Sequence, residues 1–264
     1  MFTLNEDQIT RYSRHILLKE VGLSGQEKLF GAKVLVIGTG GLGSPISLYL
    51  GAAGIGTIGI ADMDRVDLSN LQRQIAHTTD SIGQLKVESA QKRINAINPE
   101  VKVIAINEKI DAKNIINIIS EYDFILEATD NFTTKYLVND AAILTDKAFN
   151  QGGILSFQGQ TITHLPGTAS YRCVYPQAPP ENTSRGCSRT GVLGAVAGIL
   201  GTIQATEAIK YILGIGDLLI NRVLTFDALS MEFRTIPIKK TEWANMASEN
   251  TKITDLLNYH KTLP

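Results

Sequence analysis

The chain has 264 residues, of which 44% are hydrophobic and 19% are charged. This composition is typical of a folded globular protein and excludes a disordered or fibrous chain. The 25 basic and 26 acidic residues give a formal net charge of −1, which disfavours a nucleic-acid-binding role because such proteins usually carry a basic excess.

The apolar segments and the cysteines bear on where the protein works. The longest apolar run, residues 191–203, is interrupted by glycines and is shorter than the roughly 18 residues that a membrane-spanning helix needs. The acidic N-terminus lacks the pattern of a secretory signal peptide. Cys173 and Cys187 are too few for a disulfide framework. We therefore expect a cytoplasmic protein with neither a membrane nor a nucleic acid as its partner.

Strands and helices are predicted to alternate up to about residue 150. Short runs of β-branched residues predict strands, and the segments between them predict helices. After N-terminal helices within 5–30, the predicted strands are 33–37, 57–61, 101–106 and 123–128, and the predicted helices are 42–53, 86–98, 115–120 and 135–144. This order is typical of βαβ units, so we predict an α/β, Rossmann-like nucleotide-binding fold with a parallel sheet.

The pattern changes after the glycine pair at 152–153. The predicted elements of the second half are a strand over 154–165, a loop over 166–189, a helix over 191–213 and a hairpin made of 221–227 and 230–238. We therefore expect antiparallel strands to extend the parallel sheet within a single domain over 1–240, followed by a tail over 241–264. Small residues on one helix face permit close packing, either inside the chain or in a dimer, and these are Gly194, Gly198 and Gly201.

A glycine-rich turn follows the first predicted strand and precedes a predicted helix. It fits the pattern G-x-G-x-x-G and contains Gly38, Gly40, Gly41 and Gly43. Such a turn lets the backbone approach a phosphate, and the helix N-terminus supplies N–H donors. Asp62 ends the next strand, where a carboxylate accepts hydrogen bonds from ribose hydroxyls. The motif predicts a bound adenine nucleotide without choosing between NAD and ATP, and the alternative is a turn that only packs helix on strand.

Polar residues after Asp62 favour a nucleotide with a full phosphate chain. Asn70 and Arg73 stand one helical turn apart, and Lys86 follows them. Because the carboxyl ends of parallel strands face one crevice, Asp130, after the strand 123–128, should lie near the turn. The remaining candidates of this group are Asp64 and Asn131. The alternative makes the two cations solvated surface charges and Asp130 a helix N-cap.

Six segments in order carry a family resemblance: RYSRH at 11–15, the glycine turn continued to residue 45, SNLQRQ at 69–74, ATDN at 128–131, ATEAIK at 205–210 and FDALSMEF at 226–233. With these segments, over roughly residues 5 to 238, the chain resembles the ubiquitin-activating-type adenylyltransferases of bacteria. This is the family of MoeB (molybdopterin-synthase adenylyltransferase), ThiF (sulfur-carrier-protein adenylyltransferase) and HesA.

The resemblance implies a reaction and its partners. Members of this family use ATP and Mg²⁺ to adenylate the C-terminal Gly-Gly carboxylate of a ubiquitin-like sulfur-carrier protein, and they release pyrophosphate. The acyl-adenylate serves sulfur transfer in molybdopterin or thiamine biosynthesis, and the residues do not distinguish these pathways. The resemblance also implies a homodimer, with a sulfurtransferase or a cysteine desulfurase as a further partner.

The resemblance also assigns roles to the candidate residues. Asp62 would bind the ribose, and the phosphates would be bound by Asn70, Arg73 and Lys86. Asp130 would bind magnesium. Arg14 would reach the phosphates from the other subunit of a dimer. Without the family, Arg14 is only a polar residue on an amphipathic helix.

The chain departs from the family at its cysteines. Many relatives bind a structural zinc with two C-x-x-C pairs, but here the first is reduced to Ser170-x-x-Cys173 and no cysteine follows Cys187. One thiolate cannot supply four zinc ligands, so we expect no structural zinc. Cys187 precedes the helix 191–213, where relatives often have a cysteine that takes an acyl group. The helix N-terminus would lower its pKa, and the alternative is an unused loop residue.

Other functions remain as alternatives. An NAD-dependent Rossmann oxidoreductase would use the same glycine turn, although the sequence offers neither a separate substrate domain nor an evident catalytic histidine. A non-catalytic carrier-binding module is a second alternative, which Arg73, Lys86 and Asp130 disfavour. A peptide-modifying adenylating enzyme is a third.

Overall fold

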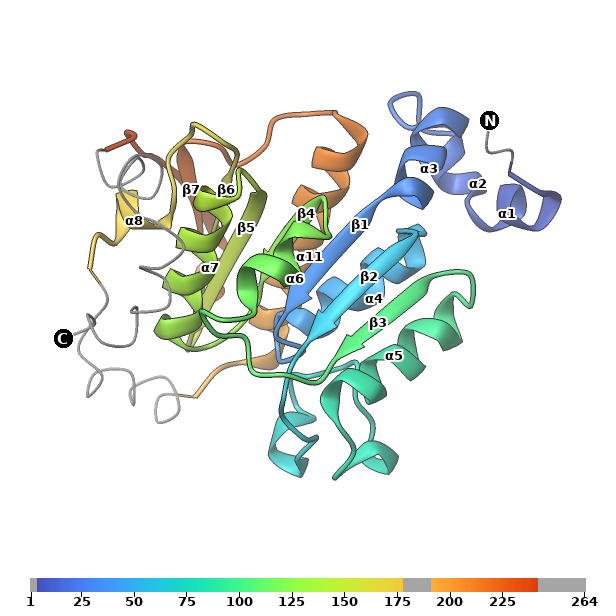
Figure 1. The fold of residues 1–264 in the computed structure, drawn as a ribbon, viewed down its shortest axis with the longest axis horizontal. Helices are drawn as coiled ribbons and strands as arrows, with labels where there is room; N and C mark the ends of the chain where they lie inside the picture. The colour runs from blue at the N-terminus through green and yellow to red at the C-terminus, as the bar shows by residue number, and fades with distance from the viewer. Residues whose placement is uncertain (1–3, 178–190, 242–264) are drawn as a thin grey trace.

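One eight-stranded sheet organises the computed structural model, which describes residues 4–177 and 191–241 (Figure 1). The strand order is β3-β2-β1-β4-β5-β6-β7-β8. The strands are β1 (Lys33–Ile37), β2 (Thr57–Ala61), β3 (Lys102–Ile106), β4 (Phe124–Glu127), β5 (Ala148–Leu155), β6 (Gln158–His164), β7 (Arg222–Asp227) and β8 (Glu232–Pro237). Strands β1 to β5 are parallel, and β6 to β8 continue the sheet antiparallel. The predicted α/β, Rossmann-like fold is confirmed.

Helices cover both faces of the sheet. They are α1 (Glu6–Arg11), α2 (Ser13–Ile16), α3 (Gly22–Gly31), α4 (Gly43–Ala53), α5 (Lys86–Ile97), α6 (Ile115–Ser120), α7 (Phe132–Leu144), α8 (Tyr171–Val174) and α11 (Gly194–Leu213), with short 3₁₀ turns at Leu68–Asn70 and Thr79–Ser81. Figure 1 shows α7 in front of the sheet and α11 behind it. Among the helices of the described ranges, none is long and apolar enough to cross a membrane.

The alternating side chains of β1 divide the core into two clusters. Val34 and Val36 pack with apolar residues of α4, α5 and α11 on one face. Leu35 and Ile37 pack with residues of α6 and α7 on the other face. All four are buried, as expected for a strand covered on both sides. This double cover leaves the ends of the parallel strands as the place for a crevice.

The second half corrects one sequence expectation. The segment 154–165 is not one strand, because β5 ends at Leu155 and β6 begins at Gln158. Ser156 turns the chain between them with a φ of 54°. Strand β5 was missed because asparagine, glutamine and glycine occupy its middle. Asn150 is fully buried there, and its amide bonds to the hydroxyls of Thr161 and Thr163 on β6, at 3.1 and 3.0 Å.

The other boundaries differ by a few residues. Helix α7 begins at Phe132, since Asn131 caps it, and α11 begins only at Gly194. The short α8 lies inside the segment expected as a loop. The predicted hairpin is present as β7 and β8. Of the predicted tail over 241–264, residues 242–264 lie outside the described residues, so the domain boundaries stay a prediction.

Two of the three small residues of α11 serve internal packing. A Cβ atom on Gly201 would lie 2.7 Å from the carbonyl oxygen of Leu42 and 2.5 Å from Pro45 Cγ, at the start of α4. A Cβ atom on Gly194 would lie 2.2 Å from the carbonyl oxygen of Gln72. Gly198, in contrast, has no neighbour within 4 Å of that position. Close approach therefore fixes α11 against α4 and against the segment that carries Arg73.

Candidate active site

An open crevice of about 1610 Å³ lies at the carboxyl ends of the parallel strands. Its lining includes Ile37 and Ala61, the last residues of β1 and β2, and Ala128, which follows β4. In doubly wound α/β folds this edge of the sheet is where ligands bind. The predicted residues that line it are Gly38, Gly40, Gly41, Asp62, Asp64, Arg73, Lys86, Asp130 and Asn131.

Two positions of the glycine turn lie so close to neighbouring backbone that no side chain fits there. Gly38 has a φ of +91°, and a Cβ there would also lie 3.0 Å from the carbonyl oxygen of Ala128. A Cβ atom on Gly43, the first residue of α4, would lie 1.8 Å from the carbonyl oxygen of Gly38. Both positions therefore require glycine. The turn places the start of α4 at the crevice, where the helix N-terminus favours an anion.

Asp62 holds the turn in place. Its Oδ2 accepts hydrogen bonds from the backbone N–H and the hydroxyl of Thr39, at 2.8 and 2.9 Å. Its Oδ1 accepts from the backbone N–H of Asp64 at 2.9 Å. The half-buried carboxylate thus joins the end of β2 to the turn, a role that the sequence did not indicate. It also lines the crevice, as a ribose-binding residue must.

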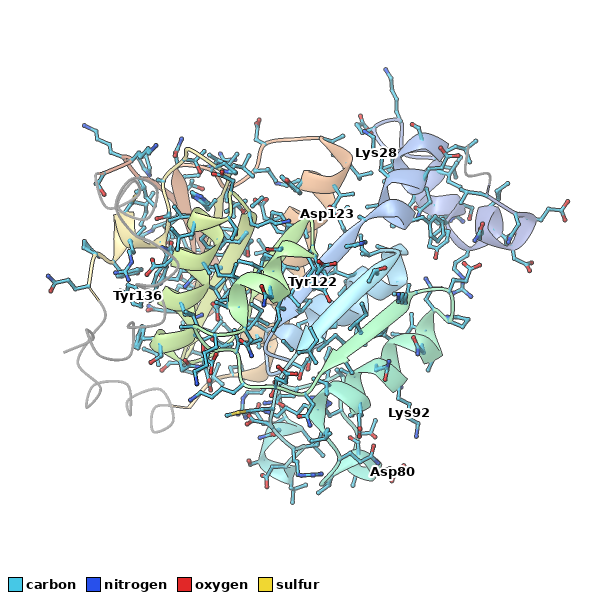
Figure 2. All side chains as sticks on the ribbon, viewed as in Figure 1. Lys28, Asp80, Lys92, Tyr122, Asp123 and Tyr136 are labelled. Atoms are coloured by element: carbon cyan, nitrogen blue, oxygen red, sulfur yellow. The ribbon has the colours of Figure 1, made fainter. Side chains whose placement is uncertain are left out.

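Two cations face the crevice from the segment that connects β2 and β3. Lys86 begins α5 and is 7% exposed, and its Nζ lies 2.8 Å from Oδ2 of Asp64. Arg73 is half-buried, and its Nη1 donates to the carbonyl oxygen of Ser69 at 3.0 Å. By contrast, Lys92 on α5 is exposed and points away from the protein (Figure 2). Lys86 and Arg73 are therefore placed to meet a negatively charged ligand.

Asp130 and its neighbours lie at the end of β4. Asp130 is exposed to the crevice, and within residues 4–177 and 191–241 no hydrogen bond engages its carboxylate. Asn131 lines the crevice too, and its Oδ1 caps α7 by accepting from the backbone N–H of Thr134 at 2.8 Å. The alternative in which Asp130 is an N-cap is therefore wrong, because Asn131 takes that position.

Asn70 and Arg14 are not brought to the crevice of this chain. The Oδ1 of Asn70 accepts from the backbone N–H of Asp67 at 3.2 Å, so the amide closes a local turn outside the crevice lining. Arg14 is exposed on α2, which packs against α3 at the end of the sheet where β1 begins. The crevice lies at the other end of β1. Cys187 lies outside the described residues.

The sequence did not single out His77, which links three parts of the site. His77 is buried, its Nε2 lies 3.1 Å from the carbonyl oxygen of Thr39, and its Nδ1 lies 3.0 Å from Oγ of Ser89 on α5. Burial lowers the pKa of His77, so the ring is neutral at pH 7. His77 therefore ties the glycine turn to the helix of Lys86. Its only signal in the sequence is its position shortly after Arg73.

The donor groups differ in their fit to zinc and to magnesium. Among the described residues, no group of three or more histidines, cysteines and carboxylates could hold a metal by itself. Cys173 instead accepts a hydrogen bond at Sγ from the backbone N–H of Ser170 at 3.4 Å. Burial would raise the pKa of Cys173, but hydrogen bonds from Thr241 and Ser170 lower it overall. Magnesium commonly takes one or two carboxylates plus substrate phosphates, so the open carboxylate of Asp130 fits it.

Comparison with known proteins identifies the family. The model of the ThiF family matches residues 12–245. The chain belongs to the ThiF family. The predicted membership of the adenylyltransferase family of MoeB, ThiF and HesA is thereby confirmed.

Two ThiF-family relatives are close in sequence. MoeZ of Mycobacterium tuberculosis, described as a probable adenylyltransferase/sulfurtransferase, is 43% identical over 263 residues. That match covers 98% of this chain but only 66% of MoeZ. The sulfur carrier protein adenylyltransferase of Thermus thermophilus is 39% identical over 260 residues, with 96% of each chain covered.

The fold also occurs in solved structures. The crystal structure of Escherichia coli MccB with ATP matches with a TM-score of 0.77 and 24% sequence identity. The match covers 90% of this chain and 73% of MccB. At this identity the likeness establishes the fold shared by the two proteins.

Proposed function

We propose that this protein is an adenylyltransferase that uses ATP to activate the C-terminal carboxylate of a small sulfur-carrier protein. One observation carries the proposal. Two cations, Arg73 and Lys86, and the open carboxylate of Asp130 surround one crevice beside the glycine turn. The names of the ThiF-family relatives, which include a sulfur carrier protein adenylyltransferase, support it. The ATP-bound relative of the same fold supports ATP as the nucleotide.

In the proposed reaction a carrier carboxylate oxygen attacks the α-phosphorus of ATP. The bond from that phosphorus to the bridging oxygen breaks, and pyrophosphate leaves with the negative charge. Arg73 and Lys86 stabilise the charge that develops on the phosphates, since fixed cations in a crevice need no reorganisation during the reaction. Asp62 binds the ribose, and the backbone of the turn contacts the phosphates. Asp130 would hold Mg²⁺, which supplies further neutralisation of the phosphate charge.

The antiparallel strands offer a path for the carrier's C-terminal tail. Gly153, Gln160, Thr225 and Arg234 are neighbours in register across β5, β6, β7 and β8, and all four line the crevice. A Cβ atom on Gly153 would have no neighbour within 4 Å, so the surface beside the nucleotide is open. We propose that an extended tail ending in Gly-Gly lies over this row.

A homodimer completes the proposed site. Arg14 would enter the crevice of the other subunit, since it lies far from the crevice of its own chain. Large apolar side chains beside it are exposed, namely Leu17 at 74%, Leu18 at 52% and Leu23 at 52%. An apolar surface of this kind is consistent with burial in a dimer.

Sulfur transfer would follow adenylation and serve molybdopterin or thiamine biosynthesis in the cytoplasm. The carboxylate itself is the nucleophile of the adenylation step, so any role of Cys187 belongs to this later transfer. MoeZ is described as a probable adenylyltransferase/sulfurtransferase, which supports a link between adenylation and sulfur transfer. We propose that a separate sulfurtransferase or cysteine desulfurase supplies the sulfur.

Exchange of labelled pyrophosphate into ATP tests the adenylation step. We expect exchange that depends on a ubiquitin-fold carrier ending in Gly-Gly and that stops when the final glycine is removed. The matched control is the same carrier with a C-terminal amide, which cannot be adenylated. Exchange with none of the carriers, together with thermal stabilisation by NAD and not by ATP, would favour the oxidoreductase instead.

A further inference from the structure

A buried ion pair lies directly beneath the loop that carries Asp130. Glu127, the last residue of β4, is completely buried, and Lys135 on α7 is 6% exposed. Nζ of Lys135 lies 2.5 Å from Oε2 of Glu127. Burial raises the pKa of Glu127, and the Lys135 ammonium acts in the opposite direction. Removing two charges from water carries a large desolvation penalty, so such a pair is weak evidence for a role in stability alone.

The pair joins three segments around the crevice. Oε1 of Glu127 accepts hydrogen bonds from the hydroxyl of Thr129 and from its backbone N–H, the latter at 2.8 Å. Nζ of Lys135 also donates to the carbonyl oxygen of Gly152 on β5 at 2.6 Å. The carboxylate thus fixes the loop after β4, and the ammonium fixes that loop against β5. Both Lys135 and Thr129 line the crevice.

Thr129 transmits this arrangement to Asp130, the next residue. No hydrogen bond within the described parts of the chain engages the Asp130 carboxylate, so its position depends on the backbone on either side. On one side of Asp130, Asn131 is held in place because its side chain caps α7. On the other side, Thr129 is held by its hydrogen bonds to Glu127. We propose that the Glu127–Lys135 pair is a positioning device that holds Asp130 at the distance from β5 that binding of Mg²⁺ and ATP requires. This inference rests on the proposed role of Asp130.

The chain contains a matched control for this pair. Glu207 on α11 is 2% exposed and is paired with Lys210. Its Oε2 accepts from the hydroxyl of Thr163 at 2.6 Å and from the backbone N–H of Leu219 at 2.7 Å. Each carboxylate therefore receives one threonine hydroxyl, one backbone N–H and one lysine. Glu207 does not line the crevice, so a comparison of the two separates loss of stability from loss of positioning.

The test is calorimetric binding of ATP, without carrier, at a series of Mg²⁺ concentrations. We expect Glu127→Gln and Lys135→Met to raise the Mg²⁺ concentration for half-maximal binding by about 10- to 100-fold, the usual effect of removing a partner that orients a metal ligand. Lys135→Arg, which keeps the charge and the donors, should restore most of the response. Glu207→Gln should lower the melting temperature by a similar amount and leave the Mg²⁺ dependence unchanged.

A milder change serves if these variants do not fold. Thr129→Val removes only the hydroxyl bond to Glu127, and it should shift the Mg²⁺ dependence in the same direction. An unchanged Mg²⁺ dependence in the folded variants would show that the pair is structural only and would overturn the proposal. Asp130→Ala distinguishes a failure of the positioning role of the pair from a failure of the proposed role of Asp130. If wild type binds ATP with Mg²⁺ and Asp130→Ala does so equally well, the assigned role of Asp130 fails first.

Discussion

At the scale of single residues, the side chains proposed to meet the phosphates and the metal differ in how firmly they are held. Lys86 is buried against Asp64, and Arg73 is fixed by one bond to the carbonyl oxygen of Ser69, whereas Asp130 is held only through its backbone. A cation that is already oriented contributes most to catalysis, since charge develops in the transition state without further reorganisation. The substitutions at these positions should therefore act on the rate more than on folding.

Asp130→Ala should abolish carrier-dependent pyrophosphate exchange, because it removes the carboxylate proposed to hold Mg²⁺ at the phosphates. The melting temperature should stay close to that of wild type, since the carboxylate makes no hydrogen bond within the described residues. The measurement pairs exchange with thermal unfolding. Exchange at the normal rate in this variant would remove Asp130 from the mechanism.

Arg73→Ala and Lys86→Ala should each raise the adenylation barrier by about 2–4 kcal/mol, the typical effect of removing one preorganised donor. Lys92→Ala on α5 is the matched control, because Lys92 is exposed and points away from the protein (Figure 2). Steady-state rates of pyrophosphate exchange give the change in the barrier for each of the three variants. An equal effect of Lys86→Ala and Lys92→Ala would mean that Lys86 acts only through the net charge.

The candidate site was predictable where residues follow the end of a buried strand. Asp62 and Asp130 were found by this rule, and the structure brings both to one crevice. Glu127 and Lys135 were missed, because charged residues are expected at the surface unless a partner is known. Their pairing depends on how α7 packs beside the end of β4, which no local sequence pattern records. Asn70 was predicted as a phosphate-binding residue from its spacing to Arg73, although in the structure its amide closes a local turn.

At the scale of elements, β-branched runs made the parallel strands predictable, and polar side chains concealed β5. A run such as KVLVI at β1 is typical of a buried parallel strand. The sequence AFNQGGIL of β5 lacks that signal, and its polar groups are satisfied only by partners in β6. The position of β5 is therefore evident only from its pairing with β6 and not from its residue types.

Helix α11 offers a prediction at this scale. Gly201→Ala should lower the free energy of unfolding by about 1–3 kcal/mol, because its Cβ would overlap Pro45 and the carbonyl oxygen of Leu42. Gly198→Ala in the same helix should raise it by about 0.5–1 kcal/mol, since that Cβ meets no neighbour and alanine favours a helix. Denaturant unfolding measures both. Equal effects of the two substitutions would contradict the tight packing of α11 on α4.

At the scale of the whole molecule, the proposed role of Arg14 requires a dimer, because Arg14 lies away from the crevice of its own chain. Arg14→Ala and Asp130→Ala should each be inactive alone, because each proposed site needs both residues. After subunit exchange, half of the dimers are mixed, and one of their two sites is intact. The mixture should therefore recover about one quarter of the wild-type exchange rate. No recovery, with mixed dimers shown by mass spectrometry, would exclude Arg14 as a residue of the partner's site.

Chemical trapping of the acyl-adenylate shows whether the crevice produces an activated carrier carboxylate. Hydroxylamine attacks an acyl-adenylate, releases AMP and leaves a hydroxamate at the C-terminus of the carrier. Intact-mass spectrometry of a Gly-Gly-ended carrier, incubated with ATP, Mg²⁺, hydroxylamine and the protein, measures this product. We predict a hydroxamate that requires ATP and is absent with Asp130→Ala. A carrier of unchanged mass, under conditions in which ATP binds, would contradict adenylation of the carrier by this protein.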